Sequence, residues 1–166
     1  MRWPPHPPGA YRLAMNPDAM VRQIAEILGR TADRATKASQ AAQAIRAAGG
    51  YRWVGIYDVA DQLVANLAWS GPGPPAHPVF PVTQGLTSTA ITTRASVLVG
   101  DVTADERYLE ALGDTRSELI VPVLDPHDGR VIGTLDVESQ RRAAFGPADQ
   151  QALESAAAAL LPLWAI

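Results

Sequence analysis

The chain contains 166 residues, of which 47% are hydrophobic, and its formal net charge is −3. This length and composition predict one folded domain with a sizeable core, and an acidic chain without a basic run is not expected to bind nucleic acid. The sequence contains no cysteine, which excludes thiol catalysis, disulfides and cysteine metal sites.

Histidines and apolar stretches add further negative expectations. His6, His77 and His127 lie in proline-rich or turn contexts without the spacing of metal ligands, so we expect no metal and no cofactor. The first residues, MRWPPHPPGAY, have prolines where a secretory signal needs an apolar core, and the apolar stretch Ala156–Ile166 is too short to span a bilayer. We therefore expect a cytoplasmic protein with no membrane partner.

The N-terminal region predicts an extended segment followed by helices. Residues 1–15 are proline-rich and expected to be extended, ahead of a single domain over residues 16–166. Asn16-Pro17-Asp18 is typical of a helix start, with an N-cap followed by proline at the first helical position. A second helix is predicted from about Thr31 to Gly49-Gly50, and its small alanine stripe permits close packing against a sheet or a partner helix.

The central region predicts strands and a loop. Tyr51–Val59 alternates as a strand, with Trp53 and Tyr57 on one face, and Gln62–Trp69 reads as its antiparallel neighbour. Ser70–Pro75 is too rich in glycine and proline for regular structure. This loop is either a pocket lid or a connector, and we favour the connector.

Shorter elements follow. His77–Val82 predicts an edge strand whose prolines limit its ladder bonds, and a short helix ends at Thr93. Ser96–Val99 is a strand candidate, Asp101–Leu112 a polar loop with a short helix, and Phe145–Asp149 opens the last helix.

A β-hairpin is the most informative local signal in the chain. Two β-branched runs, Leu119–Leu124 and Val131–Val137, flank the polar turn Asp125–Gly129. Together these elements predict an α+β sandwich with about six mainly antiparallel strands. The N-terminal and C-terminal helices should cover one face, and short helices and loops the other.

Three acids converge at the end of this hairpin. A turn centred between residues 127 and 128 places Glu118 opposite Val137, within one residue of both Asp136 and Glu138. Converging carboxylates repel each other, so a cation should meet them. That cation is either the amino group of a small ligand or a nearby arginine, of which the sequence offers Arg116, Arg130, Arg141 and Arg142.

Several strings resemble one protein family. They are YRWVGIYDV at Tyr51–Val59, VTQGLTSTAITTR at Val82–Arg94, LVGDV at Leu98–Val102, RSELIVPV at Arg116–Val123, VIGTLDVES at Val131–Ser139 and FGPADQQALE at Phe145–Glu154. In these sequence strings and in the order of its predicted elements, the chain resembles the GAF domain and, within that family, the stand-alone free methionine-(R)-sulfoxide reductases. The likeness covers about Pro17 to Leu161 and implies a GAF/profilin-like sandwich.

The resemblance places no thiol where those reductases have one. In the family, one cysteine attacks the sulfoxide sulfur and another resolves the sulfenic acid; the matching positions here are Thr87 and Ala111, and a third family cysteine is missing too. A threonine hydroxyl cannot cycle through sulfenic acid and disulfide. We therefore expect no catalytic residues and no thiol-based sulfoxide reduction.

The resemblance retains the part that holds the substrate. In the family, acids on the hairpin bind the substrate's amino group, and aromatic residues of the first strand surround its methyl sulfoxide end. The implied ligand-binding residues are Trp53, Tyr57, Thr87, Glu118, Asp136 and Glu138, the last departing from the more usual LDxDS form. Structural interpretations compete with ligand binding. Trp53 and Tyr57 are alternatively core residues, and Thr87 or Ser88 alternatively caps the short helix.

Three functions are open from sequence. The first is a non-catalytic GAF module that binds a small amine-bearing ligand, such as an amino acid or methionine sulfoxide. The second is a structural homodimer without ligand, using the helix Thr31–Ala48 and the stretch Leu160–Trp164; a side chain filling the cavity between Trp53 and Glu118 would favour it. The third is an acid–base enzyme, for which the sequence shows no nucleophile–base pair.

Overall fold

The computed structural model describes residues 15–165. The expected extended segment 1–15 therefore lies, apart from Met15, outside the described residues. The helices and strands are α1 Pro17–Leu28, α2 Arg34–Gly49, β1 Trp53–Val59, β2 Leu63–Ser70, β3 Val79–Pro81, α3 Gly85–Thr93, β4 Val97–Val99, β5 Ser117–Leu124, β6 Val131–Ser139 and α4 Pro147–Ala159, with 3-10 helices at Val102–Ala104 and Leu161–Trp164.

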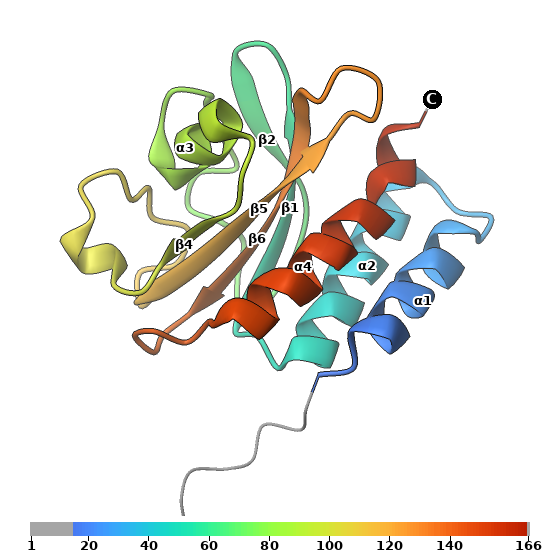
Figure 1. Cartoon of the computed structure of the whole chain (residues 1–166), viewed down its shortest axis with the longest axis horizontal. Coiled ribbons are helices and arrows are strands. Elements are labelled where there is room, and N and C mark those ends of the chain that lie inside the picture. The colour runs from blue at the N-terminus through green and yellow to red at the C-terminus, as the bar shows by residue number, and fades with distance from the viewer. Residues whose placement is uncertain (1–14, 166) are drawn as a thin grey trace, which may run out of the picture.

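Six strands form one sheet in the order β3-β2-β1-β6-β5-β4, and every neighbouring pair is antiparallel. Helices α1, α2 and α4 lie on one side of the sheet, while α3 and the long loops lie on the other (Figure 1). The predicted α+β sandwich is confirmed. Between residues 15 and 165, no helix combines the length and the hydropathy needed to cross a membrane.

The helix ends follow the capping chemistry of the sequence. The Ala19 N–H donates to Asn16 Oδ1 over 3.0 Å at the start of α1, as predicted. Helix α2 begins about three residues later than predicted, because the Asp33 carboxylate accepts the Thr36 N–H and acts as the cap. At its other end, Gly50 adopts a left-handed conformation that closes the helix.

The core between helices and sheet holds most of the buried apolar side chains. Val54 and Ile56 of β1 and Leu135 of β6 pack against the buried alanines of α2 and against Leu153 of α4. The small alanine stripe thus allows α2 to approach the sheet closely. Those alanines are used inside the fold, not displayed on its surface.

The other face of the sheet carries two separate apolar clusters. One contains Trp53, Tyr57, Val64 and Phe80. The second contains Leu86, Ala90, Val102 and Ile120. The end of the β5–β6 hairpin that lies away from its turn is between these two clusters. Polar residues at that end therefore face a space with apolar walls.

Candidate functional site: a carboxylate-lined cavity

The β5–β6 hairpin brings the predicted acids together. Glu118 pairs directly with Glu138, one residue away from the predicted register. The difference arises because the pairing shifts by one residue between Val123 and Leu124, close to the turn. Directly opposed residues in antiparallel strands share a face, so both glutamates point to the same side as Asp136.

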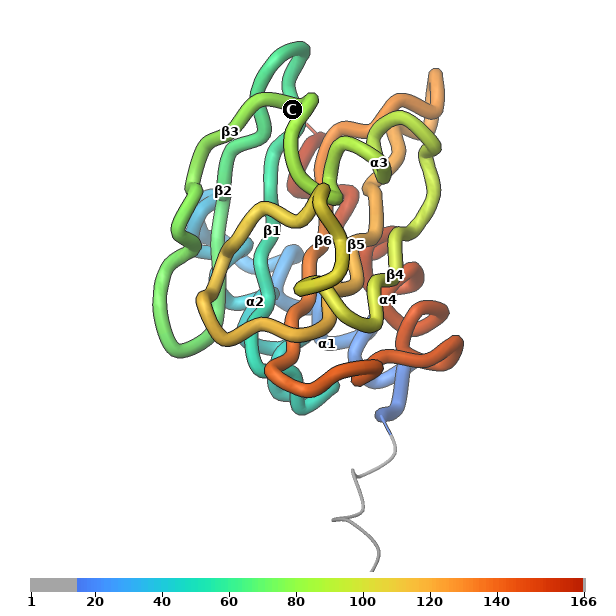
Figure 2. The backbone as a smooth tube through the Cα atoms, turned by 90° about the vertical axis from the view of Figure 1, so that its left-hand side faces the viewer, coloured from blue at the N-terminus to red at the C-terminus, as the bar shows by residue number. Residues whose placement is uncertain are grey.

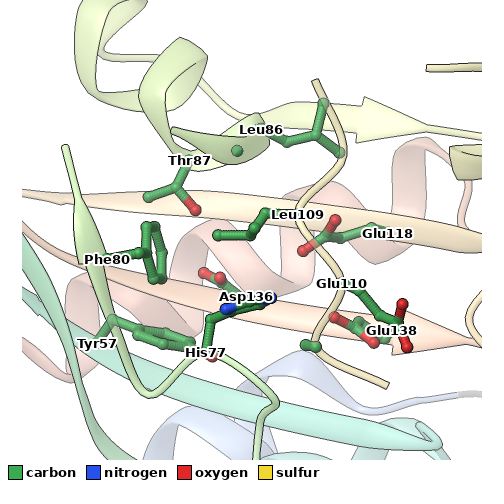
Figure 3. Close-up of a pocket in the computed structure, with 12 residues that line it drawn as sticks. Tyr57, His77, Phe80, Leu86, Thr87, Leu109, Glu110, Glu118, Asp136 and Glu138 are labelled. Atoms are coloured by element: carbon green, nitrogen blue, oxygen red, sulfur yellow. The ribbon is translucent and has the colours of Figure 1, made fainter. Parts of the chain in front are cut away.

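The three carboxyl groups line a small cavity on the face of the sheet opposite α1, α2 and α4 (Figure 3). Its volume is about 20 Å³, which is room for roughly one water molecule. Tyr57 and Phe80 form one wall and the start of α3 another. As it stands, the cavity is therefore too small for an amino acid.

Burial dominates the electrostatics of the three acids, because Glu118, Asp136 and Glu138 are each at most 6% exposed. Burial raises the pKa of Asp136 to about 7 and that of Glu138 to about 8. Burial and then the charges of Glu138 and Asp136 raise the pKa of Glu118 well above its ordinary value. Near neutral pH the cluster therefore retains protons.

The hydrogen-bonding capacity of these acids is not met. The Thr115 hydroxyl donates to Glu138 Oε2 in a short hydrogen bond. Asp136 Oδ1 and Glu138 Oε1 are buried and have no hydrogen-bond partner. Such groups carry a desolvation penalty of about 1–3 kcal/mol each, and more when ionised. A donor placed in the cavity would remove that penalty.

The arginines near the hairpin in sequence interact with other groups. Arg116 donates to the Thr115 carbonyl, Arg130 pairs with acids of the hairpin turn and Arg142 with Asp101. Within the described residues, no ion pair includes Glu118, Asp136 or Glu138. Of the two cations considered from the sequence, an arginine does not pair with these acids within the described residues, and a ligand amine remains.

The predicted aromatic residues take different positions. Gly55 lies between Trp53 and Tyr57 on β1, and a Cβ at this position would lie 2.3 Å from the Trp53 ring and 2.7 Å from the Tyr57 ring. Glycine therefore lets both rings fold over the strand, with centroids 6.4 Å apart. Tyr57 lines the cavity. Trp53 is buried behind it and donates to the Gly73 carbonyl over 3.0 Å.

Helix α3 supplies the side of the cavity that faces the acids. Its N-cap is Gln84, which makes no side-chain capping bond, so the expectation that Thr87 or Ser88 caps the helix is wrong. Thr87 is buried in the first turn and lines the cavity (Figure 3). The first-turn N–H groups thus receive no side-chain cap, which leaves a partial positive charge beside the acids.

Seven further cavity residues were not predicted to bind a ligand. Gly85 and Leu86 begin α3, and Ala111 is a loop residue. The other four are His77, Phe80, Leu109 and Glu110. Except for Phe80, they lie on two loops, residues 71–78 and 105–116, which lie over the same face of the sheet (Figure 2). The Ala76 N–H donates to the Ala111 carbonyl over 3.0 Å and joins these loops. Loop residues have no periodicity, so the sequence does not signal the tertiary contacts that bring them to the cavity.

Known proteins match the chain in sequence and in fold. The free methionine-R-sulfoxide reductase of Saccharomyces cerevisiae is 29% identical over 107 residues, which are 63% of this chain and 58% of the yeast protein. The match therefore spans less than two thirds of that relative.

Solved structures extend the likeness over more of the chain. The free methionine-R-sulfoxide reductase of Neisseria meningitidis, solved with its substrate, has a TM-score of 0.79 and 27% identity, covering 90% of this chain and 88% of that chain. The type II enzyme of Thermoplasma acidophilum has a TM-score of 0.72 and 28% identity, covering 84% and 94%.

The family model of the GAF domain matches residues 33–160, from the cap of α2 to the end of α4. This range includes all six strands and every residue of the cavity. The chain therefore belongs to the GAF domain family and is homologous to the free methionine-R-sulfoxide reductases.

Proposed function

We propose that this protein is a non-catalytic GAF module that binds a small amine-bearing ligand, an amino acid or a derivative such as methionine sulfoxide. The observation that carries the proposal is the group of three buried carboxyls, two of which have an oxygen without a hydrogen-bond partner, with no basic partner among the described residues. An ammonium group would donate to Asp136 Oδ1 and Glu138 Oε1 at once, in a charge-assisted interaction.

The groups that line the rest of the cavity match the chemistry of an amino acid, which enters only if the cavity opens. The uncapped start of α3 lies across from the acids and favours a negative group such as a carboxylate. Tyr57 and Phe80, whose ring centroids are 6.0 Å apart, give an apolar surface for an aliphatic side chain. These three features match the ammonium, carboxylate and side chain of one ligand.

Thiol chemistry forms no part of the proposal. Thr87 lies at the cavity in the position that the resemblance gives to a cysteine, and the sequence contains no cysteine elsewhere. A hydroxyl has no route through sulfenic acid and disulfide. The proposed module therefore holds its ligand without reducing it by that route.

Calorimetric titration at pH 8 with L-methionine and L-methionine (R)-sulfoxide tests the proposal. We expect binding by the wild-type chain and at least tenfold weaker binding by the double variant Glu118→Gln, Asp136→Asn, because neutral amides cannot pair with an ammonium group. Glu26→Gln with Asp61→Asn removes two exposed carboxylates and is the matched control. Wild-type binding that the first pair leaves unchanged would refute an acidic ligand site.

A second candidate is a structural GAF homodimer that binds no ligand. The small volume of the cavity favours it, because the side chain of Leu109 lies in the space between the aromatics and the acids (Figure 3). Its proposed interface is weaker, since four alanines of α2, together with Leu160 and Leu163, are buried inside the fold. A monomeric sedimentation profile together with ligand binding would exclude this candidate.

A further inference from the structure

Leu109 has an unusual position for a loop residue. Its side chain lies in the middle of the cavity, between Thr87, Phe80 and the carboxyl groups (Figure 3). It packs with the aromatic cluster of Trp53 and Tyr57. It also covers the start of α3, where a Cβ on Gly85 would lie 3.2 Å from Leu109 Cβ. One isobutyl group therefore lies beside each part of the proposed site.

The backbone around Leu109 is held on both sides but not at the residue itself. The Tyr108 N–H donates to the Asp105 carbonyl over 3.1 Å, and the Ala111 carbonyl accepts the Ala76 N–H. Within residues 15–165, no hydrogen bond involves the backbone of Leu109 or Glu110. Moving Leu109 out of the cavity would therefore break apolar contacts and no hydrogen bond.

We propose that Leu109 is a displaceable occupant of the pocket, and that its isobutyl group sets the size and shape of the ligand the site accepts. The inference rests on the proposed function and names its ligand class: primary amines with an unbranched or singly branched aliphatic chain about as large as a leucine side chain. Such a ligand takes over the contacts of Leu109 with the aromatics and adds the ammonium–carboxylate contacts that leucine cannot make. Displacement lowers the apparent affinity of the wild-type chain, because the open form is a minor state.

The test compares Leu109→Ala with Leu112→Ala by calorimetry at pH 8. Leu112 lies on the same loop and packs against the same aromatic cluster but does not line the cavity, so its variant is a matched control. The probe is 3-methylbutylamine, which carries an isobutyl group and an ammonium group. The neutral 3-methylbutanol has the same chain without the charge.

We expect the amine to bind Leu109→Ala at least tenfold more tightly than it binds the wild type or Leu112→Ala. The alcohol should also bind Leu109→Ala more tightly than the wild type, yet at least tenfold more weakly than the amine. The larger side chain of Leu109→Phe should abolish amine binding. Circular dichroism and thermal unfolding establish that each variant is folded, and Leu109→Val replaces the alanine variant if that one does not fold.

The outcomes separate this inference from the proposed function. Equal amine affinity for Leu109→Ala and the wild type would refute the displacement of Leu109 by a ligand, without refuting the amine-binding site. Equal affinity of Leu109→Ala for amine and alcohol, both tighter than wild type, would support the occupant and overturn the acidic recognition of amines. No binding of either probe to Leu109→Ala would overturn both.

Discussion

Glu118, Asp136 and Glu138 are carboxyl groups that the folded chain keeps out of water without giving them a counter-ion. Burial raises their pKa values, so they hold protons near neutral pH that the same groups release in the unfolded chain. The unfolded chain therefore binds fewer protons between about pH 4 and pH 8, and the free energy of unfolding falls as pH rises through that window.

The first prediction concerns Asp136, whose pKa is raised from 3.8 to about 7. Asp136→Asn cannot ionise, so it should unfold with a free energy roughly 2–4 kcal/mol higher than the wild type at pH 8.5, and with little difference at pH 4. Urea denaturation at both pH values measures this. Asp61→Asn, at an exposed turn, should show no such pH dependence, and a wild-type stability that rises from pH 5 to pH 8.5 would contradict the account.

Elements with local signals were predictable from the sequence, and those shaped by tertiary contacts were not. The cap at Asn16, the glycine that closes α2 and the β5–β6 hairpin rest on residues close together in the chain. The hairpin register was predicted one residue away, because a shift inside a strand leaves no mark in the sequence. The cavity side chains His77 and Leu109 come from irregular loops and escape any periodic pattern.

The second prediction concerns β1, where Gly55 makes room for two rings. Gly55→Ala places a methyl group within 2.3 Å of the present Trp53 ring position, so the rings must move. We expect a loss of about 1–3 kcal/mol in the free energy of unfolding and a changed tryptophan emission spectrum. Gly73→Ala is the control, because a Cβ there meets nothing within 4 Å; equal effects of the two variants would refute this role.

Across the whole molecule, the main apolar core and the candidate site lie on opposite faces of one sheet. The core beneath α2 and α4 is apolar and closely packed. The other face holds buried acids that oppose folding at high pH. This division was visible in the sequence as alternation along β1 and β6, which sends Leu135 and Val137 to the helices and Asp136 and Glu138 to the cavity.

The third prediction tests this division. Ile45→Ala removes a fully buried side chain from the helix-side core and should lower the free energy of unfolding by about 2–5 kcal/mol. Below its melting temperature, this variant should bind the amine probe with wild-type affinity. Glu118→Gln should do the reverse, weakening binding while leaving the fold at least as stable at pH 8. Loss of affinity in folded Ile45→Ala would show that the two faces are coupled.

Thr87 gives this cavity a practical use. Because the natural chain carries no sulfhydryl, Thr87→Cys would introduce a unique attachment point at the pocket wall. Because Thr87 is buried, a small thiol reagent would reach that sulfur only when the cavity opens, and its reaction rate would measure the opening. A bound ligand that covers the sulfur would slow the reaction.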